Sequence, residues 1–193
     1  MKVLILGAYG SLAQVATRRF LETTDAELTL FLRCPQRLGK MDDGRVRIVE
    51  GDVSDRQALR AAMVGQEVVY ANLAGNMAAL ARAIVETMKE VGLRRLIFIS
   101  SMGIYDEVPG QQYRSVLDPY RDSAAVVEAS GLDYTVVRPA WFTNDNDTNY
   151  ETTQKGQPFR GSVVSRLSVA DLIVRLAQDP SLHVKKSVGI NRL

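Results

Sequence analysis

The sequence predicts a single α/β domain, in which a doubly wound parallel sheet carries helices on both faces. The main observation is that short apolar runs alternate with stretches of helical periodicity along most of the chain. Such alternation is typical of parallel strands joined by right-handed helical crossovers. The length of 193 residues fits one domain, and the sequence shows neither an internal repeat nor a linker. We therefore expect one unit spanning residues 1–193.

Continuous apolar runs predict the strands. The first run, VLIL, directly follows the two N-terminal residues and does not alternate with polar residues. This pattern is typical of a strand that is buried on both faces of a parallel sheet. In chain order, the predicted strands span residues 3–6, 28–32, 46–49, 68–71, 96–100, 134–137, 163–167 and 187–190. The segment between the second and third strands is rich in turn-forming residues, so we predict a turn region there.

Helical periodicity fills most of the intervals between these strands. The predicted helices span residues 11–24, 55–64, 77–91, 118–130 and 169–178. Ser54 is a candidate N-cap for the second helix, and Pro119 occupies a permitted first-turn position in the fourth. Gly92 and Gly131 are placed to end the third and fourth helices, because glycine readily adopts the left-handed conformation of a helix C-terminus.

Composition excludes several classes of protein. The chain has 24 basic and 22 acidic residues, a formal charge of +2, so a nucleic-acid partner held by phosphate neutralisation is not expected. Its single cysteine cannot form an intramolecular disulfide or a paired-cysteine zinc site. The N-terminal apolar run has only four residues, and no stretch approaches the roughly 20 needed to span a bilayer. We expect a cytoplasmic protein without a membrane partner.

A glycine-rich loop directly follows the first predicted strand and opens the first helix. Its sequence is GAYGSLA, with Gly7 at the turn, Gly10 near the helix start and Ala13 within the helix. In a nucleotide-binding loop, the first glycine permits the turn, the second lets the backbone approach a diphosphate, and the third small residue permits close packing. The helix N-terminus then favours the phosphate charge. A purely structural turn is the alternative, but this context favours nucleotide binding.

The end of the second predicted strand favours NADP(H) over NAD(H). NAD-binding sites place an acidic residue there to bind the ribose 2′-hydroxyl, whereas this strand ends in Arg33, with Arg37 one helical turn later. Arginine accommodates a 2′-phosphate, although a surface arginine pair is the alternative. Asp52 follows the third strand, where a carboxylate can bind the adenine amino group or cap the next helix.

Several motifs together resemble the atypical short-chain dehydrogenase/reductase family. They are GAYGSLA, the strand-terminal Arg33, GDVSD, ISSMGIY at residues 99–105, SGLDYTVVRPAW at 130–141 and RLSVADL at 166–172. The resemblance covers nearly the whole chain and is strongest to the small NAD(P)H-binding branch, which includes NmrA-like proteins and biliverdin reductase B. It implies a Rossmann fold, with the nicotinamide above the ends of strands four and five.

The resemblance also implies which residues bind the cofactor. Each part of the cofactor has its own set of residues. The diphosphate is expected to contact Gly7, Tyr9, Gly10, Ser11 and Leu12; the 2′-phosphate, Arg33, Gln36 and Arg37; the adenine, Asp52 and Val53; the nicotinamide ribose, Leu73 and Ala74; and the nicotinamide amide, Pro139 and Ala140.

The chain departs from the catalytic pattern of typical short-chain dehydrogenases. Ser101 matches the family's serine and is the one catalytic residue that we predict. The Tyr-x-x-x-Lys pair is missing, because the fourth residue after Tyr113 is leucine and the fourth after Tyr120 is alanine. Lysine normally lowers the tyrosine pKa, and Arg121 is a partial electrostatic substitute. Standard ketone reduction is therefore in doubt.

Two functions remain open. The first is an NADPH-dependent oxidoreductase that transfers hydride to a small conjugated acceptor, such as a flavin or quinone, in an apolar cleft between residues 103–120 and 141–159. The second is a non-catalytic NADP(H) sensor of NmrA-like type, which would need a protein partner. A nucleotide-sugar epimerase or dehydratase is less expected, because the chain has no room for a separate substrate domain.

Other features of the sequence are interpreted structurally. Residues 144–149 are rich in Asn and Asp, but the glycine and glutamate of a calcium loop are replaced by Tyr150 and Gly156. We expect a solvated turn that can act as a mobile flap over the site. The only histidine, His183, is expected at the surface, and Cys34 is expected to pack without a redox role. Trp141 is expected either to stack on the substrate or to pack against the sheet end.

Overall fold

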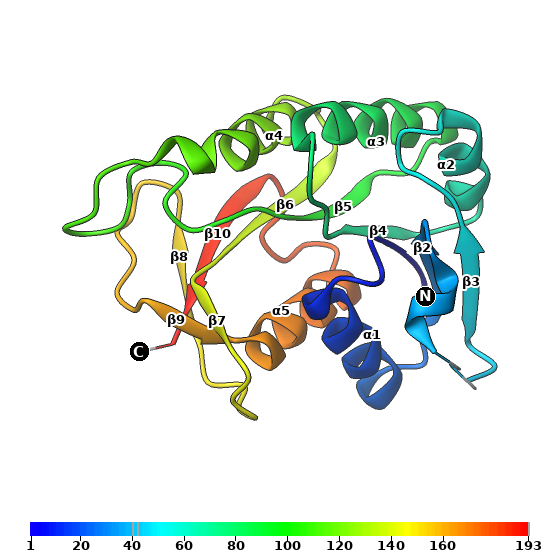
Figure 1. The fold of residues 1–193 in the computed structure, drawn as a ribbon, viewed down its shortest axis with the longest axis horizontal. Coiled ribbons are helices and arrows are strands. Elements are labelled where there is room, and N and C mark those ends of the chain that lie inside the picture. The colour runs from blue at the N-terminus through cyan, green and yellow to red at the C-terminus, as the bar shows by residue number, and fades with distance from the viewer. Residues whose placement is uncertain (40, 42, 193) are drawn as a thin grey trace.

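The computed structural model describes residues 1–39, 41 and 43–192, and its centre is an eight-stranded sheet (Figure 1). The sheet order is β3-β2-β1-β4-β5-β6-β10-β8, and β7 and β9 form a separate parallel pair. The strands are β1 (Lys2–Leu6), β2 (Glu27–Leu32), β3 (Val46–Glu50), β4 (Val68–Ala71), β5 (Arg95–Ile99), β6 (Asp133–Pro139), β7 (Trp141–Thr143), β8 (Glu151–Gln154), β9 (Val163–Ser165) and β10 (Lys186–Asn191).

Helices cover both faces of the sheet, as predicted. They are α1 (Ser11–Thr23), α2 (Arg56–Met63), α3 (Met77–Val91), α4 (Asp118–Glu128) and α5 (Arg166–Gln178). Figure 1 shows α2, α3 and α4 along one face and α1 with α5 along the other. Two short 3-10 helices, Pro35–Leu38 and Ser115–Leu117, lie in connections.

Alternate residues of β1 supply the two hydrophobic layers. Val3 and Ile5 belong to the core cluster that contains α1 and α5, whereas Leu4 and Leu6 belong to the cluster beneath α2, α3 and α4. All four side chains are fully buried. Because successive strand residues point to opposite faces, a strand covered on both sides must be apolar throughout. The continuous run VLIL therefore indicated the correct environment.

The strand order places a crevice at the carboxyl ends of β1 and β4. From β1 the chain proceeds outward to β2 and β3, then crosses back to β4 on the other side of β1 and continues to β5 and β6. All these neighbours are parallel. In open α/β sheets, ligands bind where the order reverses in this way. Only β8 is antiparallel, pairing with β10 at the far edge.

The element boundaries differ from the sequence predictions in several places, and α5 begins at Arg166, inside the predicted strand 163–167. Strands β7 and β8 were not predicted, because β7 has only three residues and the edge strand β8 reads as the polar sequence ETTQ. Ser54 is not the N-cap of α2; instead the Asp55 carboxylate accepts hydrogen bonds from the amides of Gln57 and Ala58, each at 3.0 Å. The Ser54 hydroxyl donates to Asp52 at 2.7 Å.

No helix in the described part of the chain combines the length and the apolar character needed to cross a bilayer.

His183 lies partly buried in the loop before β10, which corrects its predicted surface position. Its backbone carbonyl accepts a hydrogen bond from the Thr135 hydroxyl at 2.9 Å, and its φ of +51° lies in the left-handed region. Burial, followed by the nearby charges of Arg175, Arg95 and Lys186, lowers the pKa of the imidazole below 6.5. Protonation is therefore less favourable in the folded protein than in the unfolded chain.

This lowered pKa leads to a prediction for acid stability. The unfolded chain binds the histidine proton near pH 6.5, before the folded protein does, so folding stability is lost as the pH falls from that value through the lowered pKa. We expect His183→Asn to remove this part of the acid slope while tolerating the positive φ. Urea denaturation of both proteins at closely spaced pH values below 6.5 measures it. Identical slopes would contradict the prediction.

Candidate active site

A cavity of about 660 Å³ lies at the carboxyl ends of the N-terminal strands and contains most of the predicted cofactor residues. Its lining includes Gly7, Tyr9, Gly10, Ser11, Leu12, Arg33, Arg37, Asp52, Val53, Leu73 and Ala74. Gln36 is outside this lining, and Pro139 with Ala140 instead lines an adjoining cavity. The topology therefore brings residues from four separate loops to one crevice.

The glycine loop lies directly against Asn72, the residue that follows β4. Gly7 has a φ of +75°, and a Cβ atom on it would lie 2.1 Å from the Asn72 carbonyl oxygen. A Cβ on Gly10 would lie 2.4 Å from the Asn72 side-chain nitrogen. We predicted that Gly10 leaves space for a diphosphate, but in this structure it also leaves space for Asn72. The sequence analysis missed Asn72, although its position directly after a buried strand was a usable signal.

Two arginines lie at the end of β2, where a 2′-phosphate was predicted. The Arg33 side chain is 80% exposed and lies 3.9 Å from an Asp52 carboxylate oxygen. The Arg37 guanidinium lies 5.6 Å from the centre of the Tyr9 ring. Hydrogen bonds from the Ser54 amide and hydroxyl, together with Arg33, lower the pKa of Asp52. Because the Arg33 ion pair is long and solvent-exposed, its charge remains available to a phosphate.

Cys34 follows Arg33 and is exposed in the cavity lining. The prediction that this cysteine is packed was therefore wrong, because the chain leaves β2 at this point and turns along the cavity.

The second cavity, of about 290 Å³, adjoins the first and is largely apolar. Asn72, Leu73 and Phe142 line both cavities, so the two lie side by side. One wall is formed by residues of the segment 102–120, as predicted, and the opposite wall by Trp141 and Phe142. Residues after Phe142 do not line it. The Trp141 side chain is 66% exposed at the rim, so it does not pack against the sheet end.

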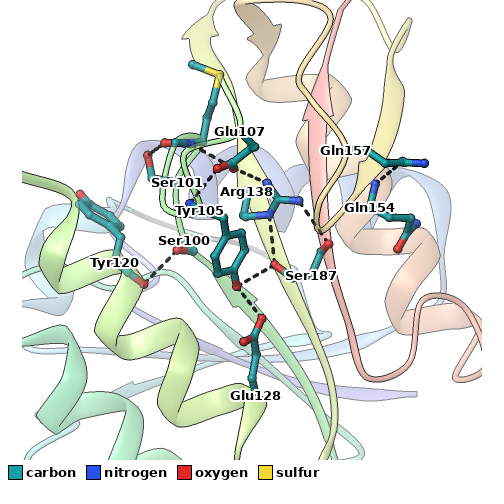
Figure 2. A network of polar contacts seen from close by, with 12 residues as sticks. Ser100, Ser101, Tyr105, Glu107, Tyr120, Glu128, Arg138, Gln154, Gln157 and Ser187 are labelled. Atoms are coloured by element: carbon teal, nitrogen blue, oxygen red, sulfur yellow. Dashed lines mark hydrogen bonds and ion pairs between the residues drawn. The ribbon is translucent and has the colours of Figure 1, made fainter. Parts of the chain in front are cut away.

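A buried ion pair anchors the first wall to β6 (Figure 2). The Arg138 guanidinium pairs with the Glu107 carboxylate, and both side chains are almost fully buried. The same carboxylate accepts hydrogen bonds from the amides of Gly103 at 3.1 Å and Tyr105 at 2.8 Å. Arg138 also donates to the Ser187 hydroxyl at 3.1 Å. A charge pair with further hydrogen bonds at both ends holds this loop in one conformation.

Tyr105, the tyrosine of the ISSMGIY motif, does not line the second cavity. Its hydroxyl donates to Glu128 and lies 3.2 Å from the Ser187 hydroxyl (Figure 2). Burial and the Glu128 hydrogen bond raise the pKa of the Tyr105 hydroxyl. Glu128 also forms an ion pair with Lys155, with 2.7 Å between the carboxylate oxygen and the ammonium nitrogen. Tyr105 therefore belongs to the polar network of Glu128 and Ser187, outside the cavity lining.

The serine hydroxyls of the second cavity are bonded to the backbone. Ser100 donates to the Tyr120 carbonyl at 3.2 Å, and Ser101, the predicted catalytic residue, donates to the Met102 carbonyl at 3.1 Å (Figure 2). Both line the cavity. A substrate oxygen would have to compete with these carbonyls for the hydroxyl proton.

Tyr113 of the same cavity and the neighbouring Arg121, which does not line it, do not reproduce a tyrosine–lysine pair. The Tyr113 hydroxyl donates to Asp118 at 2.7 Å, and burial together with this carboxylate raises the tyrosine pKa. Arg121 lies over the Tyr113 ring but pairs with Asp118 at 3.1 Å and Asp122 at 2.8 Å. A catalytic lysine would lower the tyrosine pKa. The charge of Arg121 lowers the pKa of Tyr113, as expected of a partial substitute, but burial and the Asp118 hydrogen bond outweigh it.

The Asn/Asp-rich segment 144–149 is held by side-chain contacts. Arg192 pairs with Asp145 at 2.8 Å and with Asp147 at 3.6 Å. The Asp147 carbonyl accepts from the Ser165 hydroxyl at 2.7 Å. Among residues 1–39, 41 and 43–192, no group of three or more histidine, cysteine or acidic residues is arranged to hold a metal ion.

Comparison with known proteins identifies the family. The family model for NAD(P)H-binding proteins matches residues 7–180. The chain belongs to this NAD(P)H-binding family. Its members bind the cofactor that the glycine loop predicts, and the residues of the first cavity fit that group. The match confirms the predicted cofactor class and the resemblance to the small NAD(P)H-binding branch of atypical short-chain dehydrogenases/reductases.

Solved structures of similar chains support the same family assignment. A Rossmann-fold NAD(P)-binding family protein from Shigella flexneri is 39% identical, with 99% of this chain and 93% of that chain covered and a TM-score of 0.89. A short-chain dehydrogenase/reductase from Veillonella parvula, solved in complex with NADP, is 28% identical, with 99% and 94% covered and a TM-score of 0.87. These neighbours confirm the Rossmann-type fold.

One curated relative is named for a different activity. The uncharacterized sugar epimerase YhfK of Bacillus subtilis is 20% identical over 190 residues, which cover 90% of this chain and 86% of that protein. The proteins to which this chain is similar are thus named both as a dehydrogenase/reductase and as an epimerase.

Proposed function

We propose that this member of the NAD(P)H-binding family is an NADPH-dependent oxidoreductase that reduces a small conjugated acceptor, such as a flavin or quinone. The observation that carries the proposal is that the apolar cavity adjoins the cofactor cavity, with Asn72, Leu73 and Phe142 lining both. When bound, NADPH supplies the hydride. The protein then positions an apolar acceptor beside the cofactor and limits the access of water.

The choice of NADPH rests on the two arginines at the end of β2. A 2′-phosphate carries the negative charge that these guanidinium groups can bind with charge-assisted hydrogen bonds. The Veillonella parvula relative, which was solved with NADP, supports the same choice. NADH lacks this phosphate and would bind through the glycine loop alone at this end.

The choice of a conjugated acceptor rests on the polar groups of the second cavity. The described lining contains neither lysine nor histidine, and the pKa of Tyr113 is raised. A conjugated acceptor delocalises the electron pair that it receives with the hydride, and water can supply the proton. Trp141 and Phe142 offer aromatic surfaces against a planar ring. The cavity therefore favours a reaction that depends on positioning the acceptor over one that depends on proton transfer from a side chain.

The test is an assay of purified protein with NADPH and a panel of flavins, quinones and dyes. We expect NADPH oxidation well above background with at least one acceptor, and a lower kcat/KM with NADH. Tight NADPH binding without turnover of any acceptor would contradict the reductase. It would favour a sensor instead.

Tyr113→Phe tests the absence of tyrosine catalysis. We expect the variant to keep kcat within about threefold of wild type, because general acid catalysis by a side chain contributes about 10²- to 10⁴-fold where it operates. The variant loses only the hydrogen bond to Asp118. Steady-state kinetics with the best acceptor of the panel measures the effect. A loss of about 100-fold in kcat, with acceptor KM unchanged, would assign the proton donor to Tyr113.

The sensor is a second candidate, favoured by the internal hydrogen bonds of Ser100, Ser101 and Tyr113. In this function the chain binds NADP(H) and reports the redox state to a protein partner. It requires different affinities for NADP⁺ and NADPH, because a ligand pair with equal affinity shifts no equilibrium. Calorimetric titration with both forms distinguishes the two functions.

A further inference from the structure

Arg166 lies beside the first cavity, although no part of the cofactor prediction includes it. It is the first residue of α5, directly after the N-cap Ser165, and belongs to the RLSVADL motif. Its Nε lies 3.2 Å from the hydroxyl of Ser11, which opens α1 and lines the cofactor cavity. Ser11 and Arg166 are 155 residues apart in the sequence, so the starts of α1 and α5 meet at the glycine loop.

The partners of Arg166 leave its charge uncompensated. Nη1 donates to the Asn144 side-chain oxygen at 2.8 Å and to the Thr143 carbonyl at 3.4 Å. The guanidinium also lies 4.9 Å from the centre of the Phe142 ring. All these partners within the described chain are neutral. By contrast, Arg192 on the same side is paired with the carboxylates of Asp145 and Asp147.

We propose that Arg166 is a cofactor-binding residue that contacts the diphosphate of NADP(H). The diphosphate is expected at Ser11 and the N-terminus of α1, whose free amides favour negative charge. An arginine adds a full charge and up to five donors, which suit phosphate oxygens better than the neutral acceptors it now contacts. The Phe142 ring, which the guanidinium faces at 4.9 Å, lines both the cofactor cavity and the acceptor cavity.

The inference rests on the NADP(H) binding of the proposed function but not on any acceptor chemistry. The test therefore measures binding, by calorimetric titration of NADPH and of adenosine 2′-monophosphate, which lacks the diphosphate. We expect Arg166→Gln to weaken NADPH binding about 10- to 100-fold and adenosine 2′-monophosphate binding less than about twofold. Arg166→Lys should recover part of the loss, because it restores the charge.

Arg192→Gln is the matched control. It removes an arginine that holds residues 145–147 but does not reach Ser11, so we expect unchanged NADPH affinity. Equal losses in Arg166→Gln and Arg192→Gln would show that Arg166 acts only by ordering that segment, and would overturn the proposal. An equal loss for both ligands, or no loss, would also overturn it. If wild type binds NADPH but reduces no acceptor, the reductase fails while this test still decides the role of Arg166.

Discussion

Arg33→Ala is expected to weaken NADPH binding by about 10- to 100-fold while NADH binding stays within about threefold of wild type. The reason is that Arg33 is 80% exposed at the end of β2 and is held only by a 3.9 Å ion pair with Asp52. Its removal costs the folded protein little but deprives the 2′-phosphate of a charge-assisted partner. NADH carries a neutral 2′-hydroxyl at this position, so it has no charge-assisted contact with Arg33 to lose. Calorimetric titration of both cofactors measures the ratio.

Arg60→Ala is the control for a general change in charge. Arg60 is exposed on α2 and does not line the cofactor cavity, so both affinities should remain unchanged. An equal loss of NADPH and NADH binding in Arg33→Ala would contradict the prediction. It would instead show that Arg33 acts through Asp52, whose pKa is lowered in part by this arginine.

The parts of the fold and site that depend on neighbouring residues could be predicted from the sequence. The run VLIL followed by GAYG identifies a buried strand, a glycine with φ of +75° and the start of α1 within ten residues. The position of Arg33 at the end of a strand could be predicted in the same way, because β2 is the next parallel strand. In each case the physical constraint acts within one strand–helix unit.

The contacts between distant segments could not be predicted. Arg166 reaches Ser11 only because α5 packs beside α1 on one face of the sheet (Figure 1). Arg138 and Glu107 form a buried pair from a strand and a loop that look like ordinary polar positions in the sequence. Such pairs carry no periodicity and no fixed spacing. These contacts depend on how the whole domain packs, and the sequence pattern of a single segment gives no information about that packing.

Gly7→Ala is expected to be strongly destabilising, with a loss of about 3 kcal/mol or more in the free energy of unfolding. The new Cβ would lie 2.1 Å from the Asn72 carbonyl oxygen, at a φ of +75°. Gly92→Ala is the matched control, because Gly92 has a φ of +74° but a Cβ on it would meet no atom within 4 Å. It should lose only about 1–2 kcal/mol, the cost of the left-handed backbone. Urea denaturation measures both, and equal losses would contradict the steric argument.

Asn72 provides the second half of this test. A Cβ on Gly10 would meet the Asn72 side chain at 2.4 Å, whereas the clash at Gly7 is with its backbone. Asn72→Ala should therefore restore most of the stability lost in Gly10→Ala and none of that lost in Gly7→Ala, because only the side chain is removed. NADPH titration of the Gly10→Ala, Asn72→Ala double variant then separates the two roles of Gly10. If the double variant is stable but binds NADPH more weakly than Asn72→Ala alone, the glycine is also needed for approach of the diphosphate, and equal binding by these two variants would mean that it serves Asn72 alone.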